Sequence, residues 1–328
     1  RRVEGVYYTL DEDARRQEQP PALDEKVLTG WNGLAIAALA RAGFAFADPA
    51  LTAAAVMAAD HLLEHHLRRD GSLVRASIAG RTSAAQATLE DFGMCALGLL
   101  ELALATGEVR YAAAARRLID GTLGGTDAGT VPPTADTGGG GATGGTTGGT
   151  TRGTTVGMPF RAPDGPDPVL AGQGLALDVD PSEGAYPSGI TATAEAANLL
   201  YLLTADDRYR TAAAAAMAVL AGRALERPLA FGAALRLSSV LAGPVEQLVV
   251  VRPDAATPAE PAGLLAAVRR RGAGLVASVT QSQAQAFADA GFELFRDRVT
   301  REGRPTAYLC RDFVCRLPVT DPSDLPVA

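Results

Sequence analysis

Apolar residues recur with helical spacing in three long segments, and a short polar turn interrupts each segment once. Each segment predicts two helices joined by a turn, and the second helix of each pair is rich in Ala. Tyr111 and Tyr209 occupy matching positions at the start of this second helix in two pairs. The pattern predicts a repeat of helical hairpins of about 32 residues. The three segments are Leu34–Leu67, Gly93–Leu123 and Ala192–Arg223.

The pattern changes near residue 244, after a further predicted helix over Ala230–Leu241. Two β-type runs and an amphipathic helix between them follow, and then two shorter strand-like pieces. We therefore divide the chain into a helical-hairpin domain, residues 1–243, and a small α/β appendage, residues 244–328. The runs of the appendage cover 247–251, 263–271, 275–280, 307–310 and 313–315.

An insert at about residues 124–160 separates the second and third hairpins. Its middle part, 137–157, consists almost only of Gly and Thr. Such a run buries too little apolar surface to offset the entropy that it would lose on folding. We therefore expect the insert to be disordered.

Composition narrows the class of protein. Hydrophobic residues make up 47% of the 328 residues but aromatic residues only 5%, so small side chains must allow the helices to pack closely. A net charge of −7 argues against a nucleic-acid partner, and no apolar run reaches the roughly 18 residues of a membrane span. Three cysteines argue against a disulfide-built secreted domain. We expect a piece of a longer cytoplasmic protein.

The rarest side chains of the chain gather in one block, Asp24–Asn32. Lys26 is the only lysine beside 29 arginines, Trp31 is the only tryptophan, and Asn32 is one of two asparagines. One interpretation is a sugar site, in which Trp31 stacks on a ring and Asp24 and Asn32 bond its hydroxyls. The alternative is a helix start, in which Thr29 caps the helix, the Trp packs and the Lys pairs with a carboxylate.

Four motifs occur along the chain, and they are Asp24–Leu34, Leu89–Phe92, Tyr186–Gly189 and Ala307–Cys315. They resemble motifs of a family of thioredoxin-domain-containing proteins that includes spermatogenesis-associated protein 20. Their order and spacing match along nearly the whole chain. In this family a thioredoxin-like domain precedes a helical toroid of the six-hairpin glycosidase type, (α/α)6. The resemblance implies that this chain is part of the toroid and that the thioredoxin-like domain is missing from it.

The resemblance implies a mainly α fold, a partial α/α toroid that carries the small α/β appendage. Related toroids occur in sugar epimerases and glycoside hydrolases, so a small sugar is the expected ligand and epimerase- or hydrolase-like activity the enzyme hypothesis. The alternative is a non-catalytic scaffold for the thioredoxin-like domain in redox or protein quality control. The chain departs from the family at Ile190, where an Asn is usual, and in its Gly/Thr-rich insert.

Glu90 and Asp91 are the candidate catalytic carboxylates. Glycoside hydrolysis uses two carboxyl groups on opposite sides of the scissile bond, and neighbours on a helix diverge. Asp91 would therefore need a distant partner such as Glu183. In the alternative interpretation both acids stabilise the first turn of a helix. Lys26, Tyr186 and Ser188 are further candidates for substrate binding, and Ser188 is equally suited to cap the next helix.

Histidine and cysteine patterns give weaker signals. His61-x-x-Glu64-His65 matches an inverted zinc-protease motif, but a downstream acidic ligand is not evident, so we expect neither a metal nor a cofactor. Cys310 and Cys315 would supply only half of a zinc site. We expect both of them to be buried and reduced on strands, and Cys95 to lie in the core.

Overall fold

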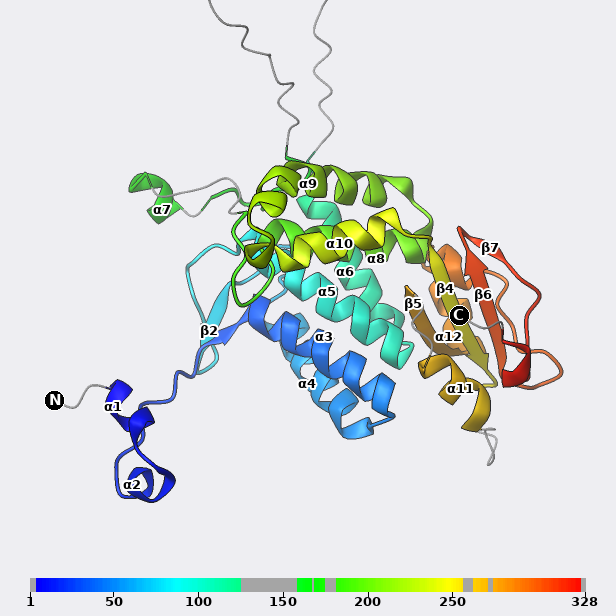
Figure 1. The fold of residues 1–328 in the computed structure, drawn as a ribbon, viewed down its shortest axis with the longest axis horizontal. Helices are drawn as coiled ribbons and strands as arrows, with labels where there is room; N and C mark the ends of the chain where they lie inside the picture. Colours follow the sequence, from blue (N-terminus) through cyan, green and yellow to red (C-terminus); the bar gives the residue numbers. More distant parts are fainter. Residues whose placement is uncertain are drawn as a thin grey trace, which may run out of the picture.

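A computed structural model describes residues 4–124, 158–166, 168–174, 181–255, 262–270 and 274–325. Within these ranges the protein is rich in helices and contains two small sheets, which confirms the mainly α class (Figure 1). The predicted disorder over 137–157 falls outside the described residues. No described helix is long and apolar enough to cross a membrane.

All three predicted hairpins are confirmed. Helices α3, α5 and α8 form one layer in this order, and α4, α6 and α9 each pack against their own hairpin partner (Figure 1). The predicted helix over 230–241 is confirmed as α10, which packs on α8 and α9 after a 3-10 turn at Pro228–Ala230. The helices are α3 (Thr29–Phe46), α4 (Pro49–His65), α5 (Leu89–Thr106), α6 (Val109–Thr122), α8 (Gly189–Thr204), α9 (Asp207–Glu226) and α10 (Gly232–Ala242).

Local sequence explains the tight turns within the hairpins. Ala47 ends α3 and Ala205 ends α8 in the left-handed conformation, and Gly107 does the same at the end of α5. The carboxylates of Asp48 and Asp206 then accept hydrogen bonds from the first backbone N–H groups of α4 and α9. These reversals lay each pair of helices side by side in opposite directions.

Glycines bring α3, α5 and α8 into close contact. A Cβ at Gly33 would lie 2.6 Å from the backbone nitrogen of Cys95, and one at Gly93 would lie 2.5 Å from that of Thr193. Positions later in one helix contact positions later in the next, as Gly30 lies near Asp91 and Gly33 near Cys95. The three helices therefore run parallel. Their N-terminal ends consequently meet at one end of the layer.

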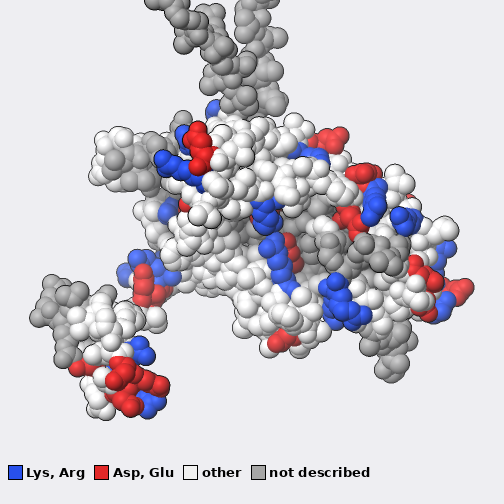
Figure 2. All heavy atoms as spheres, viewed as in Figure 1, with Lys and Arg blue, Asp and Glu red and all other residues white. Residues whose placement is uncertain are grey.

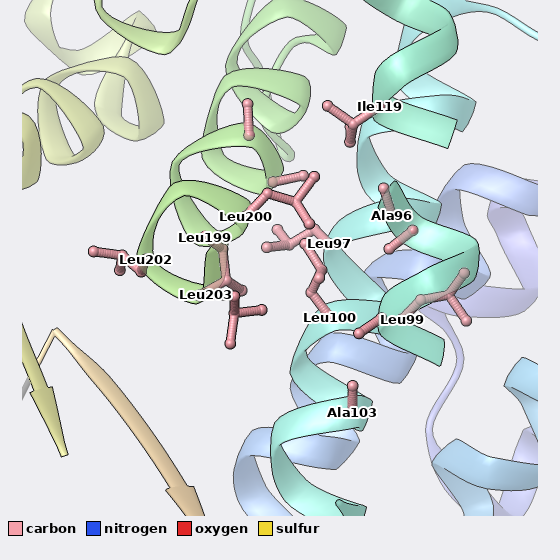
Figure 3. Close-up of a cluster of buried hydrophobic side chains, with 14 of the residues drawn as sticks. Ala96, Leu97, Leu99, Leu100, Ala103, Ile119, Leu199, Leu200, Leu202 and Leu203 are labelled. Atoms are coloured by element: carbon pink, nitrogen blue, oxygen red, sulfur yellow. The ribbon is translucent and has the colours of Figure 1, made fainter. Parts of the chain in front are cut away.

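Aliphatic side chains fill the space between α5 and α8. Leu97 and Leu100 of α5 point toward Leu200 and Leu203 of α8 (Figure 3). These four side chains are at most 3% exposed. The seam is therefore built from Leu and Ala, as the low aromatic content predicts.

The matching tyrosines of the repeat join successive outer helices. The Tyr111 hydroxyl lies 2.8 Å from a carboxylate oxygen of Asp60 on α4, and the Tyr209 hydroxyl lies 2.6 Å from that of Asp120 on α6. In each case the preceding arginine pairs with the same carboxylate. Both tyrosine rings are buried, and burial raises the pKa of each phenol well above its usual range. The repeat in sequence is thus a repeat of contacts.

A four-stranded sheet, in the order β5-β4-β6-β7, packs against the helices. Strands β4 and β5 are parallel, β4 pairs antiparallel with β6, and β6 with β7. Val249 and Val251 of β4 join the core of the helical layer, while Leu248 and Val250 face a second cluster beneath α11. The elements are β4 (Glu246–Arg252), α11 (Ala262–Arg269), β5 (Leu275–Thr280), α12 (Gln281–Asp289), β6 (Thr306–Arg311) and β7 (Val314–Cys315).

Shorter elements complete the described chain. The first sheet comprises three short antiparallel strands beside the start of α3. None of these strands was predicted, and neither were α1, α2, α7 and α12. They are α1 (Glu4–Thr9), α2 (Glu12–Arg16), β1 (Val27–Leu28), β2 (Ala76–Ile78), β3 (Arg81–Thr82), α7 (Pro168–Gly172) and 3-10 turns at Glu293–Phe295 and Pro322–Asp324.

Candidate functional site

Three of the predicted motifs meet where α3, α5 and α8 begin. The backbone N–H of Gly30 donates to Asp91 Oδ1 at 3.1 Å, which joins the start of α3 to that of α5. A Cβ at Gly189 would lie 2.7 Å from the backbone nitrogen of Glu90, so α8 begins against the first turn of α5. Motifs far apart in the sequence therefore form one surface at this end of the layer.

Two aromatic side chains are the most exposed apolar groups of this surface. Trp31 is 56% exposed and Tyr186 is 37% exposed. Their rings contact each other edge to face, with centroids 5.9 Å apart. In the alternative interpretation Trp31 packs at the helix start, but its side chain on α3 faces outward and contacts Tyr186. The pair instead forms an accessible apolar platform.

Polar groups of the first block flank this platform. Asn32 Nδ2 donates to the Leu28 carbonyl at 2.8 Å, which orients its amide at the first turn of α3. Lys26 Nζ lies 3.2 Å from Asp24 Oδ2, so the predicted pairing of the only lysine with a carboxylate is confirmed. Hydrogen bonds from Lys26 hold the pKa of the exposed Asp24 carboxyl below its usual range.

Asp91 caps two helices from a buried position. Besides the bond from Gly30, its Oδ2 accepts hydrogen bonds from the Thr88 backbone N–H at 2.9 Å and the Thr88 hydroxyl at 3.1 Å. Arg75 approaches the same oxygen at 3.5 Å. Burial raises the pKa of Asp91, and these hydrogen bonds and the arginine oppose the rise. Both carboxylate oxygens are therefore engaged within the protein.

The remaining candidates have distinct surroundings. Glu90 is half-buried next to Asp91 at the junction with α8. Ser188 is fully buried, and its hydroxyl accepts the Thr191 backbone N–H at 3.3 Å, which confirms its role as a helix cap. Glu183, suggested as a partner for Asp91, instead accepts backbone N–H groups at the start of α10. Ile190 lies fully in the core.

A buried polar network beside the site was not predicted. Thr29 does not cap α3; its hydroxyl contacts His66 Nδ1 at 2.6 Å and donates to the Val74 carbonyl. The other ring nitrogen of His66 lies 2.8 Å from the Ser77 hydroxyl on β2. This network ties α3, the end of α4 and the first sheet together. The sequence signal for this network was the adjacent pair His65-His66, but the sequence does not say which of the two rings is buried. Packing in the fold buries His66 and leaves His65 exposed.

Burial makes His66 a pH-sensitive element of stability. Burial lowers the pKa of His66, and the nearby His61 and His65 lower it further. The unfolded chain therefore binds a proton on this residue at a higher pH than the folded protein does. We therefore expect unfolding free energy to be lost as pH falls below about 6.5, the usual pKa of an unfolded histidine, toward the lowered pKa of the folded state.

Denaturant unfolding of His66→Gln and of His65→Gln between pH 5 and 7.5 measures this contribution. His65 is the last residue of α4, directly before His66, and its side chain is exposed. The His66 variant should be less stable at neutral pH, with a weaker pH dependence than the parent. His65→Gln should keep most of the parental dependence, because burial and His61 still lower the pKa of His66 in that variant. An unchanged slope in His66→Gln would contradict the assignment.

A row of charged residues crosses four helices away from the predicted motifs. Arg41 of α3 donates to Glu101 of α5 at 2.7 Å and to Glu195 of α8 at 3.3 Å. Arg236 of α10 pairs with Glu195 from the other side. Because both carboxylates are engaged by arginine, the row joins neighbouring helices. Acidic and basic side chains are also interspersed over the face seen in Figure 2.

Two cavities lie outside the surface at the helix ends. One, of about 870 Å³, is bounded by α4, α6 and the turn around Asp70–Ser72. The other, of about 310 Å³, lies between Arg41, Glu101 and the start of β5. Neither is lined by a predicted site residue. Trp31 and Tyr186 lie outside both cavities, on the exposed surface.

The zinc motif does not assemble a site in the described part of the chain. His61 and His65 are exposed on α4, with ring centroids 4.6 Å apart. No cluster of three or more metal-binding side chains occurs among the residues that the structure describes. The histidine pair alone defines no metal centre.

The expectation of two reduced cysteines in the tail is wrong. Cys310 and Cys315 form a disulfide between directly opposed positions of β6 and β7. A two-residue turn separates these strands, and this brings the two positions together. Cys95 is buried on α5 as expected, and burial raises the pKa of its thiol to about 12.

Comparison with known proteins identifies no family for this chain. No protein-family model matches it, and no curated protein matches it. What the structure itself defines is a mainly α protein of helical hairpins, in which three of the four predicted motifs share one end of a helical layer.

Proposed function

We propose that the helical hairpins belong to an α/α toroid that binds a small carbohydrate at the N-terminal ends of α3, α5 and α8. The observation that carries the proposal is the exposed pair of Trp31 and Tyr186, with ring centroids 5.9 Å apart. These side chains come from separate motifs, yet they form one platform. Large aromatic groups are costly to leave in water, and a sugar offers a matching apolar face of C–H groups.

The flanking polar groups suit a sugar better than a purely apolar ligand. Asn32 is fixed by its bond to the Leu28 carbonyl, which leaves its amide oxygen as an acceptor for a hydroxyl. Lys26 and Asp24 are exposed beside the same helix start. Ligand sites typically combine an apolar surface with a few fixed polar groups.

The parallel order of α3, α5 and α8 supports the toroid part of the proposal. An α/α toroid repeats hairpins so that the inner helices begin at one end of the ring, and these three helices begin at one end of their layer. Within this proposal Asp91 positions the helix starts, because its oxygens bind the N-terminal groups of α3 and α5. Glu90 remains the candidate acid at the surface.

Thermal unfolding with a panel of mono- and disaccharides at about 10 mM tests the proposal. A ligand with a millimolar Kd should add about 1.4 kcal/mol and raise the melting midpoint by about 2 °C. We expect Trp31→Ala to abolish the shift. Phe46→Ala is the matched control, because Phe46 is an exposed aromatic residue on the same helix at its other end.

The outcomes separate the proposed functions. A sugar-specific shift that survives in Phe46→Ala and disappears in Trp31→Ala supports binding at the platform. A shift that persists in Trp31→Ala places the sugar elsewhere. A cooperative transition that no sugar moves favours the scaffold function, in which the same surface contacts protein.

A further inference from the structure

The hairpin of β6 and β7 carries a disulfide whose surroundings set it apart from a buried structural cross-link. Cys310 is 1% exposed, whereas Cys315 is half-buried on the last strand in the order of the sheet. Val314 and Leu317, on either side of Cys315, are 75% and 89% exposed. An external thiol can therefore reach the sulfur of Cys315 more readily than that of Cys310.

A guanidinium group lies directly against the disulfide. Arg298 Nη2 is 2.9 Å from Cys315 Sγ and 4.0 Å from Cys310 Sγ. The arginine also lies over the ring of Tyr308, 5.1 Å from its centroid. Among the described residues, none of its contacts is an ion pair with a carboxylate. Burial lowers the pKa of Arg298, so a nearby anion would stabilise its charged form.

We infer that Cys310 and Cys315 form a thiol–disulfide exchange site that accepts electrons from a dithiol reductant. A thiolate of the reductant attacks Cys315 Sγ, a mixed disulfide forms, and the Cys310–Cys315 bond breaks with Cys310 leaving as a thiolate. The second thiolate of the reductant then attacks the mixed disulfide and releases Cys315 as a thiolate. The pair gains two electrons and, on protonation, two protons, while the reductant becomes a disulfide.

Arg298 promotes both departures by the same electrostatic effect. Exchange is faster when the departing thiol has a lower pKa, and a neighbouring cation lowers the pKa of a thiol. The guanidinium group of Arg298 is near both sulfur atoms and nearest to that of Cys315, which is the thiolate released in the second step. Arg298 is therefore a positioning and charge-stabilising residue for exchange, while the two cysteines are the reacting groups.

Reduction would also act on the contact between the sheet and the helices. The disulfide closes a turn in which Asp312 and Phe313 adopt φ angles of 47° and 63°, a left-handed region that Asp tolerates and Phe rarely adopts. This turn places the Phe313 ring against Tyr201 of α8, with centroids 5.1 Å apart. Breaking the cross-link frees the turn to relax, and the site thus connects redox state to packing against α8.

Reduction kinetics of the full chain test the inference. The air-oxidised protein is exposed to dithiothreitol at pH 7, and free thiols are trapped with iodoacetamide and assigned by peptide mass spectrometry. We expect Arg298→Met to slow reduction of the pair about fivefold and Arg298→Lys to retain part of the rate. Buried Cys95 reports on folding in the same samples, because only unfolded chains expose it to alkylation.

Three outcomes would overturn the inference. The first is a purified, air-exposed protein in which both cysteines are already free thiols. The second is a pair that becomes reducible only when Cys95 also becomes reactive, which is the behaviour of a structural disulfide. The third is an unchanged rate in Arg298→Met with Cys95 still protected. Fast reduction with Cys95 protected, slowed by the loss of the Arg298 charge, supports exchange.

Discussion

Gly33→Ala is expected to destabilise the protein by about 3 kcal/mol, at the upper end of the usual cost of overpacking. The added methyl group would lie 2.5 Å from the Met94 carbonyl carbon and 2.6 Å from the Cys95 nitrogen. Both atoms belong to the backbone of α5, so no side-chain rotation can relieve the clash. Helices α3 and α5 would have to move apart, and the Gly30–Asp91 bond lies at the same interface.

Urea unfolding of Gly33→Ala and Gly222→Ala measures this effect against a matched control. Gly222 is exposed within α9, and nothing lies within 4 Å of the Cβ that Ala would add there. The control should be stabilised by up to about 1 kcal/mol, because Ala favours helix more than Gly does. Equal midpoints for Gly33→Ala and the parent would show that α3 and α5 are not in close contact.

Asp91→Ala is expected to remove about 3 kcal/mol of stability, since it leaves several donors at two helix starts without their acceptor. The Gly30 and Thr88 backbone N–H groups both bind this carboxylate. Loss of a helix cap costs about 1 kcal/mol, and each buried donor left without a partner costs about 1–3 kcal/mol. Chemical denaturation measures the change.

Two further variants separate a structural role of Asp91 from a catalytic one. Glu108→Ala is the control for stability, because Glu108 is exposed and its side chain forms no cap at the start of α6. It should change stability by less than about 0.5 kcal/mol. Asp91→Asn retains one acceptor oxygen and should lose stability while keeping any sugar binding. A stable Asp91→Asn variant that fails only in turnover would favour the catalytic hypothesis instead.

Regular patterns in the sequence predicted most of the regular elements. The 3.6-residue period of the three segments indicated the hairpins, and the alternating or continuous apolar runs indicated β4, β5 and β6. Other signals were present but overlooked. Thr280 and Gln283 form a capping box that starts α12, and this spacing is a recognisable helix signal. The short strands β1–β3 offer only two or three residues each, too few for a period.

The candidate site was predictable as a set of motifs but not as a geometry. The rarity of Trp31 and Asn32 pointed to the start of α3, and Ser188 had the residue type of a helix cap. Sequence left both interpretations of Asp91 open, because hydrogen bonds from Gly30 depend on how α5 lies against α3. Likewise, nothing local predicts that Arg41 bridges Glu101 and Glu195.

For the cysteine pair, too, the residues were evident in the sequence and the tertiary structure decided their bonding. The spacing Cys-x4-Cys does not match common redox or zinc motifs, so the residues alone suggested two reduced side chains. A two-residue turn between β6 and β7 places them opposite each other and forms the disulfide. The neighbouring Arg298 approaches from before β6, twelve residues from Cys310.

Sequence by itself determined the helical hairpins, their tight turns and the strands of the appendage, because these depend on side-chain periodicity and local backbone preferences. Tertiary structure alone decided that Trp31 meets Tyr186, that Asp91 caps two helices, that His66 is buried and that Arg298 lies against a disulfide. Those contacts join residues whose separation along the chain carries no periodic signal. They arise only when the tertiary fold brings these segments together, as close packing through glycine does for α3, α5 and α8.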